Sequence, residues 1–201
     1  ITDTVHWLAP PWLGAGIITD VVGKIKEAGK TTFVLAMCAA IVKGQPFLEQ
    51  MTAQSSVIYL TEQAGPSFRE ALDRAGLIPS DDFVLLQWAE TRGEQWPTIV
   101  YTAVAEAYRR GAGVLVVDTL PPFAGIIGDD EGKAGAALEA MAPLVTAAAE
   151  YELAVVTVRH ERKASGSVAD AGRGSSAFGG AVDTLLQLVH PAKKGKDAVR
   201  D

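Results

Sequence analysis

A chain of 201 residues is long enough for one domain with a large core, and a composition of 48% apolar and 21% charged residues is ordinary for a globular protein. The formal net charge of −6 excludes a protein whose whole surface attracts nucleic acid, so DNA contact would need a local basic patch or a ring of subunits. The single cysteine, Cys38, excludes an internal disulfide and suits a reducing cytoplasm. No apolar run approaches the roughly 18 residues of a membrane span, so no membrane contact is expected.

Short apolar runs rich in β-branched residues alternate with helical patterns along the chain. The predicted strands are Ile17–Val22, Ser56–Thr61, Phe83–Gln87, Val114–Asp118, Ala154–Val158 and Thr184–Val189. The predicted helices are Thr31–Val42, Ser67–Ala75, Thr98–Arg110 and Lys133–Tyr151. Most of the strands are nearly continuous in Val, Ile and Leu, which is typical of strands buried on both faces. The alternation predicts a three-layer α/β fold with a mostly parallel sheet and helices on both faces.

The segment from Gly23 to Thr32 joins the first predicted strand to the first predicted helix and contains Gly-Lys-Thr. In such a loop the backbone N–H groups and the helix dipole favour a bound phosphate. Lys30 would reach the β- and γ-phosphates of a nucleotide, and Thr31 would offer its hydroxyl to a magnesium ion. The candidate nucleotide-binding residues are Gly23, Lys24, Ala28, Gly29, Lys30, Thr31 and Thr32.

The spacing of this loop departs from the strict P-loop pattern. That pattern has four residues between its first glycine and Gly-Lys-Thr, whereas Gly23 lies one residue too early and Lys24 stands at the expected position. We favour a longer loop, because Gly23 ends the strand where a sharp turn is due. The alternatives are that Lys24 takes the first position, or that the segment is an ordinary turn with a chance Gly-Lys-Thr.

Ligands in open α/β sheets bind beyond the carboxyl ends of the strands, so the residues that follow each predicted strand are site candidates. Asp118 ends four apolar β residues and would hold magnesium together with Thr31, in the Walker B arrangement. The alternative for Asp118 is a cap of the following turn. Arg159 and His160 follow another strand and are expected on the same rim. His160 would sense the γ-phosphate, link the nucleotide to the long loop that follows, or have only a structural role.

Glu62 follows the predicted strand Ser56–Thr61 and is the candidate catalytic base. Many P-loop ATPases carry a catalytic glutamate directly after the Walker B aspartate, but Thr119 occupies that position here. Glu62 is therefore predicted to orient and polarise the attacking water. The alternative is a solvated loop carboxylate. The histidines lack metal-ligand spacing, so no zinc site is expected.

The chain is predicted to form a single domain over residues 1–201, with a lead-in over 1–16 and a polar tail over 192–201. Residues 161–180 are rich in Gly, Ser and Ala and form either a mobile functional loop or a merely disordered one. Within this loop, Arg173 is a candidate arginine finger or nucleic-acid contact, unless it is only solvated. Acidic residues 129–131 are expected in a solvated turn, the alternative being a second metal contact. The four tryptophans are expected to pack in the core or at its rim; they are Trp7, Trp12, Trp88 and Trp96. For Trp7 and Trp12 the alternative is a position beside the adenine of a nucleotide.

Five segments carry these motifs in order. They are residues 22–24 with 29–32, 57–62, 116–120, 159–163 and 173–177. In this order the motifs resemble those of the RecA-like P-loop ATPases, most closely the branch that includes the hexameric plasmid-replication helicase RepA and many phage and mobile-element AAA-type ATPases. The chain departs from that pattern in its longer P-loop and in Arg159, which stands where the family often has a first histidine.

The resemblance implies a RecA-like domain with ATP and Mg²⁺ as cofactors. The site residues that it implies are Lys30 and Thr31 for phosphate and magnesium, Glu62 for catalysis, Asp118 as the Walker B aspartate, His160 as the histidine of a His-His-x-x-Lys-like segment, and Arg173 as a finger or DNA-loop residue. It also implies a homo-oligomer, either a filament or a ring such as a hexamer, with ATP between subunits.

The leading hypothesis is an ATPase that converts hydrolysis into work on DNA, such as a helicase or replication motor acting on single-stranded DNA. A second hypothesis is a regulatory module that binds ATP and hydrolyses it slowly or not at all. A small-molecule kinase of the P-loop class is the third, although the sequence shows no lid rich in arginines.

Overall fold

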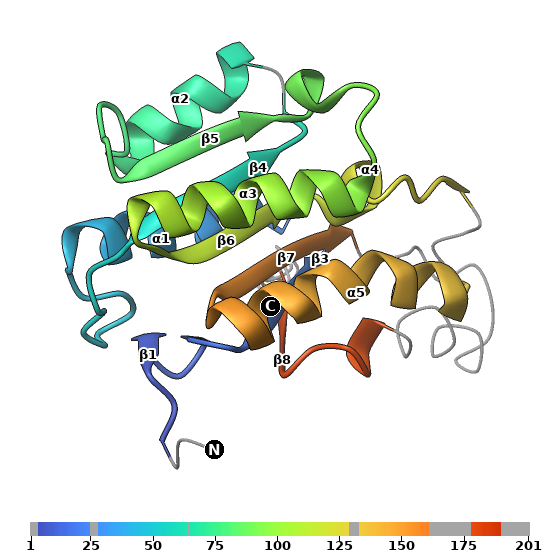
Figure 1. The fold of residues 1–201 in the computed structure, drawn as a ribbon. Coiled ribbons are helices and arrows are strands. Elements are labelled where there is room, and N and C mark those ends of the chain that lie inside the picture. Colours follow the sequence, from blue (N-terminus) through green and yellow to red (C-terminus); the bar gives the residue numbers. More distant parts are fainter. Residues whose placement is uncertain (1–3, 25–27, 64, 129–132, 161–177, 190–201) are drawn as a thin grey trace, which may run out of the picture.

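The computed structural model describes residues 4–24, 28–63, 65–128, 133–160 and 178–189. Within these residues, six strands form one sheet whose strand pairings are all parallel (Figure 1). In spatial order the strands are β5 (Phe83–Gln87), β4 (Ser56–Thr61), β6 (Ala112–Asp118), β7 (Ala154–His160), β3 (Ile18–Gly23) and β8 (Thr184–Leu188). The strand that precedes the glycine-containing loop, β3, thus lies between β7 and β8.

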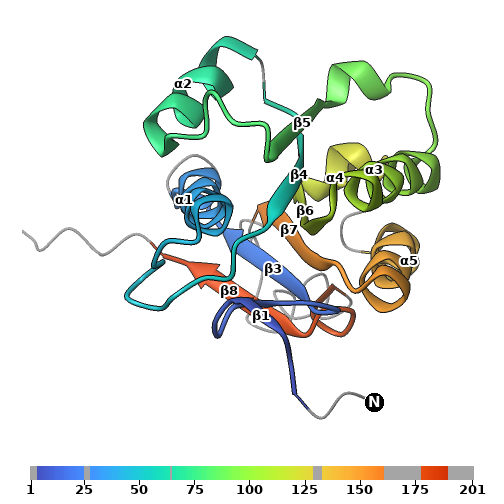
Figure 2. The same ribbon diagram turned by 60° about the vertical axis from the view of Figure 1, so that its left-hand side comes forward.

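Helices cover both faces of the sheet. They are α1 (Lys30–Lys43), α2 (Gly65–Ala75), α3 (Trp96–Arg110), α4 (Leu120–Phe123) and α5 (Ala134–Tyr151). Figure 2 shows α1 and α2 on one side of the strands and α3, α4 and α5 on the other. The predicted three-layer α/β fold is confirmed. None of the helices in the described part of the chain is long and apolar enough to cross a membrane.

Each face of the sheet has its own hydrophobic core, because successive side chains of a strand point to opposite faces. On β6, Val114 and Val116 belong to the core under α1 and α2, whereas Leu115 and Val117 belong to the core under α3 and α5. All four side chains are fully buried. This burial on both faces explains why the central strands are nearly continuous in apolar residues.

The predicted elements exist with small shifts at their ends, and β4 and β5 have the predicted bounds. One shift matters for the site. Arg159 and His160 were expected after the fifth predicted strand, but they are the last two residues of β7. The expectation is wrong because β3 continues to pair beside them, with Val22 opposite Arg159 and Gly23 opposite His160.

Short elements escaped prediction. Residues of the expected lead-in form a two-stranded antiparallel sheet of β1 (Trp7–Ala9) and β2 (Leu13–Gly14), and a 3-10 turn, η1 (Trp88–Thr91), follows β5. Elements of two to four residues are too short to show a hydrophobic period.

The buried aromatic and thiol side chains mostly have the expected packing role. The Trp96 side chain is 8% exposed, and its Nε1–H donates to the backbone oxygen of Ala140 at 2.8 Å, which joins α3 to α5. Trp12 packs edge-on against Phe47 with 5.6 Å between ring centroids. Cys38 in α1 is completely buried, and burial raises the pKa of its thiol, as expected for a small hydrophobe. Trp88, by contrast, is 42% exposed.

Several sequence-based predictions fall outside the described residues. These are Arg173, the acidic residues 129–131, the tail 192–201 and most of the loop 161–180. At the end of that loop, Phe178 is only 2% exposed and belongs to the core under α3 and α5. The predicted loop, which runs to residue 180, therefore extends too far at its C-terminal end.

Candidate functional site

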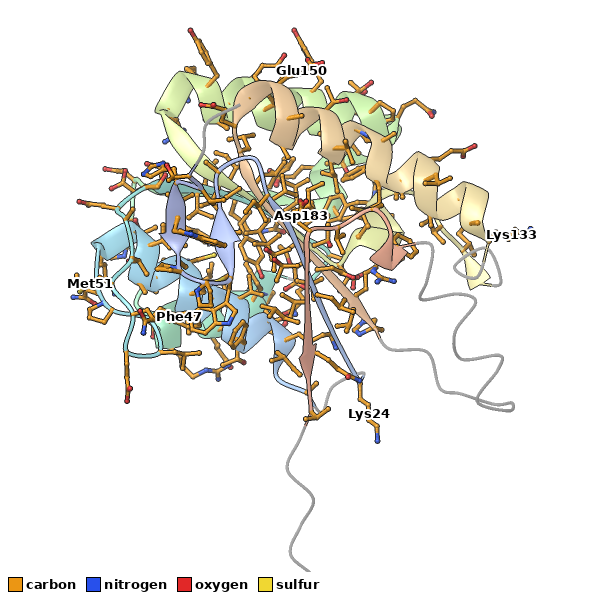
Figure 3. All side chains as sticks on the ribbon, turned by 90° about the horizontal axis from the view of Figure 1, so that it is seen from below. Lys24, Phe47, Met51, Lys133, Glu150 and Asp183 are labelled. Atoms are coloured by element: carbon orange, nitrogen blue, oxygen red, sulfur yellow. The ribbon has the colours of Figure 1, made fainter. Side chains whose placement is uncertain are left out.

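The first residue of α1, Lys30, reaches back to the end of β3. The Lys30 Nζ donates to the backbone oxygens of Gly23 and Lys24, at 2.9 Å each, and the Lys30 residue is only 6% exposed. Gly29 precedes α1 in the left-handed conformation, at φ 68° and ψ 24°. The contact with Gly23 supports a loop that begins at this glycine and has five residues, 24–28, before Gly29. Figure 3 shows Lys24 itself projecting away from the protein body.

Gly23 has no room for a side chain. A Cβ atom at this position would lie 2.7 Å from the Cβ of Ala28 and 2.7 Å from the backbone oxygen of Leu188 in β8. Neither of these atoms is the end of a flexible side chain, so the loop or the strand would have to move. The glycine thus permits a close approach between the loop and the edge strand.

We expect Gly23→Ala to lower the free energy of unfolding by about 1–3 kcal/mol, the usual cost of overpacking. Denaturant unfolding of the full chain measures this change. The matched control is Gly135→Ala in α5, where a Cβ would meet nothing within 4 Å and alanine favours the helix. Equal unfolding midpoints for the two variants would contradict the tight fit at Gly23.

Asp118 ends β6 beneath the start of α1 and is 1% exposed. Its Oδ2 accepts hydrogen bonds from the Thr31 hydroxyl at 2.8 Å and from the Tyr59 hydroxyl at 2.7 Å. Burial raises the pKa of Asp118 above that of an ordinary aspartate, and these two hydrogen bonds oppose the shift. The predicted pair of Thr31 and Asp118 therefore lies together. Asp118 does not cap the following turn, because the N-cap residue of α4 is Thr119.

Glu62 directly follows β4 and is fixed to the end of β6, the adjacent strand. Its backbone N–H donates to the backbone oxygen of Asp118 at 3.0 Å, and its Oε1 accepts a hydrogen bond from the Thr119 hydroxyl at 2.6 Å. The carboxylate is thus oriented even though the residue is exposed. A neighbouring amide also reaches the site, because the Gln63 Nε2 donates to the Thr31 hydroxyl oxygen at 3.1 Å.

These side chains surround one cavity of about 360 Å³ at the carboxyl ends of the strands. Its lining residues are Gly29, Lys30, Thr31, Thr32, Glu62, Gln63, Ser67, Asp118, Thr119 and His160. The predicted residues Gly23, Lys24 and Ala28 belong to the loop beside this cavity rather than to its lining. Neither Trp7 nor Trp12 is among the lining residues of this cavity.

Sequence reasoning missed Gln63, Ser67 and Thr119 as lining residues. The sequence presents Thr119 only as the residue in the place of a glutamate. Its hydrogen bond to Glu62 depends on β4 lying beside β6, and the sequence carries no signal of that order.

Arg159 and His160 point to opposite faces of β7. His160 lines the cavity, whereas the Arg159 guanidinium forms a buried ion pair with Asp20 of β3 and lies 3.9 Å from the centre of the Phe178 ring. The Thr157 hydroxyl also donates to Asp20 Oδ1, at 2.8 Å. The expectation of Arg159 on the cavity rim is therefore wrong. Asp20 is a carboxylate inside the mostly apolar strand β3, and a buried carboxylate needs a charged or hydrogen-bonding partner. This position was the sequence signal that Asp20 has such a partner.

The donor atoms around Thr31 and Asp118 fit a magnesium ion. A hydroxyl and a carboxylate offer the oxygen ligands that Mg²⁺ prefers, and Mg²⁺ beside a nucleotide usually takes only one or two protein carboxylates, with phosphates and water completing its shell. In the described part of the chain there is no group of three or more His, Cys, Asp or Glu side chains that could hold a metal.

The parallel sheet, the lysine-bearing loop between strand and helix, and the Asp118–Thr31 pair define a P-loop nucleotide-binding protein. The sequence matches the AAA domain family over residues 2–166, a span that contains every lining residue of the cavity. The chain belongs to this family of P-loop ATPases. No curated protein matches the sequence.

Proposed function

We propose that this protein is a magnesium-dependent ATPase that hydrolyses ATP to do work on DNA. One observation carries the hydrolytic part of the proposal: Lys30, Glu62 and the hydrogen-bonded pair of Thr31 and Asp118 line the same cavity. A cation, a metal-binding pair and an oriented carboxylate are the groups that phosphoryl transfer to water requires.

Binding of ATP would begin at the start of α1. The loop N–H groups and the positive end of the helix dipole attract the phosphates, and the Lys30 ammonium exchanges the backbone oxygens of Gly23 and Lys24 for phosphate oxygens. Thr31 and Asp118 would hold Mg²⁺, which neutralises charge on the β- and γ-phosphates. Thr32 lines the cavity beside them.

Glu62 is the proposed general base. Water attacks the γ-phosphorus in line with the bond to ADP, Glu62 accepts the proton of that water, and ADP and phosphate leave. The Thr119 hydroxyl donates to Glu62 Oε1, so Oε2 is the oxygen proposed to accept the proton of the attacking water. His160, which lines the same cavity, is proposed to sense the γ-phosphate.

The DNA part of the proposal is supported by the resemblance of the ordered motifs to RepA-like helicases and mobile-element ATPases. Because the net charge is −6, DNA contact needs a local basic patch or a ring of subunits rather than the whole surface of one subunit. We therefore propose a homo-oligomeric ring, such as a hexamer, with ATP at subunit interfaces and Arg173 acting in a neighbouring site or on single-stranded DNA. The single cysteine supports a cytoplasmic location.

The deciding experiment is ATP hydrolysis with Mg²⁺, with and without single-stranded DNA, at a protein concentration that permits assembly. Strong stimulation by DNA would support the motor. Turnover that ignores DNA would leave an ATPase with another task, and absence of both ATP binding and turnover would overturn the proposal.

For the site itself, we expect Lys30→Ala to weaken ATP binding by about 10–100-fold, since hydrogen bonds to charged groups contribute about 1.5–3 kcal/mol. Isothermal titration with a non-hydrolysable analogue measures the dissociation constant. The control is Lys43→Ala at the opposite, exposed end of the same helix, which removes the same charge and leaves the cavity intact. Equal affinities of the two variants would rule out Lys30 as the phosphate ligand.

A regulatory ATP-binding module is the second candidate. It is favoured by the extra loop residue before Gly29 and by Thr119 in the position where many relatives of this class carry glutamate. Tight ATP binding with slow turnover, unchanged by DNA, would support this candidate over the motor.

A further inference from the structure

Asp118 is held by a second hydrogen bond that the proposed mechanism does not use. Besides Thr31, the buried hydroxyl of Tyr59 donates to the same carboxylate oxygen, Oδ2, at 2.7 Å. Tyr59 belongs to β4, the strand that pairs with β6, and it is completely buried. Both hydrogen bonds fall on Oδ2, so Oδ1 is the oxygen that they leave for a metal ion.

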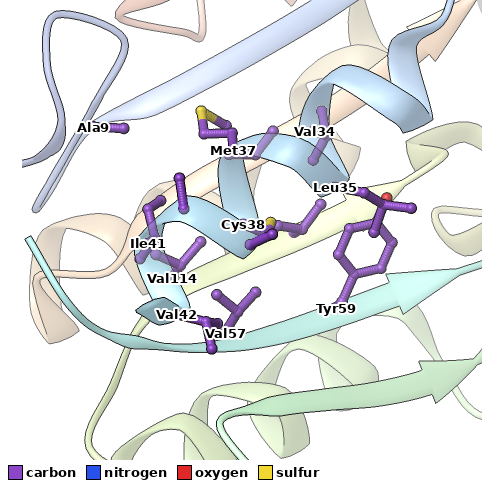
Figure 4. Close-up of a cluster of buried hydrophobic side chains, with 14 of the residues drawn as sticks. Ala9, Val34, Leu35, Met37, Cys38, Ile41, Val42, Val57, Tyr59 and Val114 are labelled. Atoms are coloured by element: carbon purple, nitrogen blue, oxygen red, sulfur yellow. The ribbon is translucent and has the colours of Figure 1, made fainter. Parts of the chain in front are cut away.

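The Tyr59 ring is fixed by its surroundings. It packs against Phe68 of α2 and Phe83 of β5, with ring centroids 5.5 and 5.4 Å away. Figure 4 shows the ring reaching from β4 toward α1, beside Leu35. Because the ring cannot move far in this packing, its hydroxyl is a fixed donor beneath Asp118.

We propose that Tyr59 is a positioning residue that holds the Asp118 carboxylate in the orientation that Mg²⁺ requires. Mg²⁺ demands near-ideal octahedral geometry, whereas Ca²⁺ accepts variable coordination. A carboxylate held at Oδ2 from two sides cannot turn to suit a larger ion, so Tyr59 gives the site a preference for Mg²⁺ over Ca²⁺. This inference rests on the proposed function, because the metal arrives with the nucleotide.

The test is Tyr59→Phe in the full chain, a change that removes one oxygen and keeps the packed ring. Dissociation constants of a non-hydrolysable ATP analogue are measured with Mg²⁺, with Ca²⁺ and with a chelator. We expect unchanged affinity without metal and about a tenfold loss of the affinity gained from Mg²⁺, the usual effect of removing a group that orients a metal ligand. The gain from Ca²⁺ should fall much less.

The matched control is Thr52→Val. It also removes a buried hydroxyl, one that donates to the backbone oxygens of Ala40 and Gln45 near the opposite end of α1. Thermal unfolding measures how much stability Thr52→Val and Tyr59→Phe each lose. We expect Thr52→Val to keep the wild-type gain in analogue affinity from both Mg²⁺ and Ca²⁺.

The outcomes separate the two proposals. If the wild-type chain binds the analogue and Tyr59→Phe loses Mg²⁺ and Ca²⁺ responses equally, or loses neither, the inference about Tyr59 is overturned while the nucleotide site stands. If the wild-type chain binds no analogue under any condition, the proposed function and this inference both fall. A selective loss of the Mg²⁺ response supports the positioning role.

Discussion

Replacing Glu62 by glutamine is expected to lower ATP turnover by about 10²–10⁴-fold, the contribution typical of a general base. Glutamine has nearly the same shape and can still accept the hydrogen bond of Thr119, but it cannot accept a proton from water. ATP binding should persist, because Lys30 and Thr31 are unchanged. The variant should therefore trap the ATP-bound protein.

Steady-state turnover and the dissociation constant for ATP, measured on the same preparation, check this expectation. Glu139→Gln, on the exposed face of α5, is the matched control and should turn over ATP like the wild type. Loss of ATP binding in Glu62→Gln would indicate a structural role. Wild-type turnover in Glu62→Gln would exclude this residue as the base.

Replacing Arg159 by methionine is expected to lower the free energy of unfolding by about 3–5 kcal/mol. The change leaves the Asp20 carboxylate, which is completely buried, without its guanidinium partner. It also removes the cation that faces the Phe178 ring. Chemical denaturation of the variant and the wild type measures the loss.

Two controls test whether the loss of stability comes from leaving a buried carboxylate unpaired rather than from removing an arginine. Arg109→Met breaks an exposed ion pair with Glu106 on α3 and should change stability far less. The double variant Asp20→Leu with Arg159→Met should recover much of the loss, because apolar replacement of both partners removes the unpaired buried charge. A double variant as unstable as Arg159→Met alone would contradict this explanation.

The part of the site that could be predicted from the sequence depends on one rule. In a parallel sheet, residues that follow the strands meet at one edge, and this rule predicts that Glu62 and Asp118 lie together beside the loop that contains Gly-Lys-Thr. The order of the strands was not needed, since every carboxyl end lies on that edge. The helices could also be predicted from the helical patterns between the strands, and α1 and α3 begin and end within two residues of the predicted bounds.

The contacts that depend on strand order could not be predicted in this way. The bonds from Tyr59 to Asp118 and from Thr119 to Glu62 exist because β4 lies beside β6, and the pair of Asp20 and Arg159 exists because β3 lies beside β7. The length of β7 also mattered. Two further residues of strand sent Arg159 to the face away from the cavity, since side chains alternate along a strand.

The alternation of Arg159 and His160 on β7 places an anchor directly beside a cavity residue. The ion pair of Arg159 with Asp20 and its contact with the Phe178 ring hold the end of β7 from the α5 side. His160, the next residue, faces the cavity on the α1 side from that same strand end. The packing on one face of the sheet therefore fixes the backbone from which a cavity residue on the other face extends.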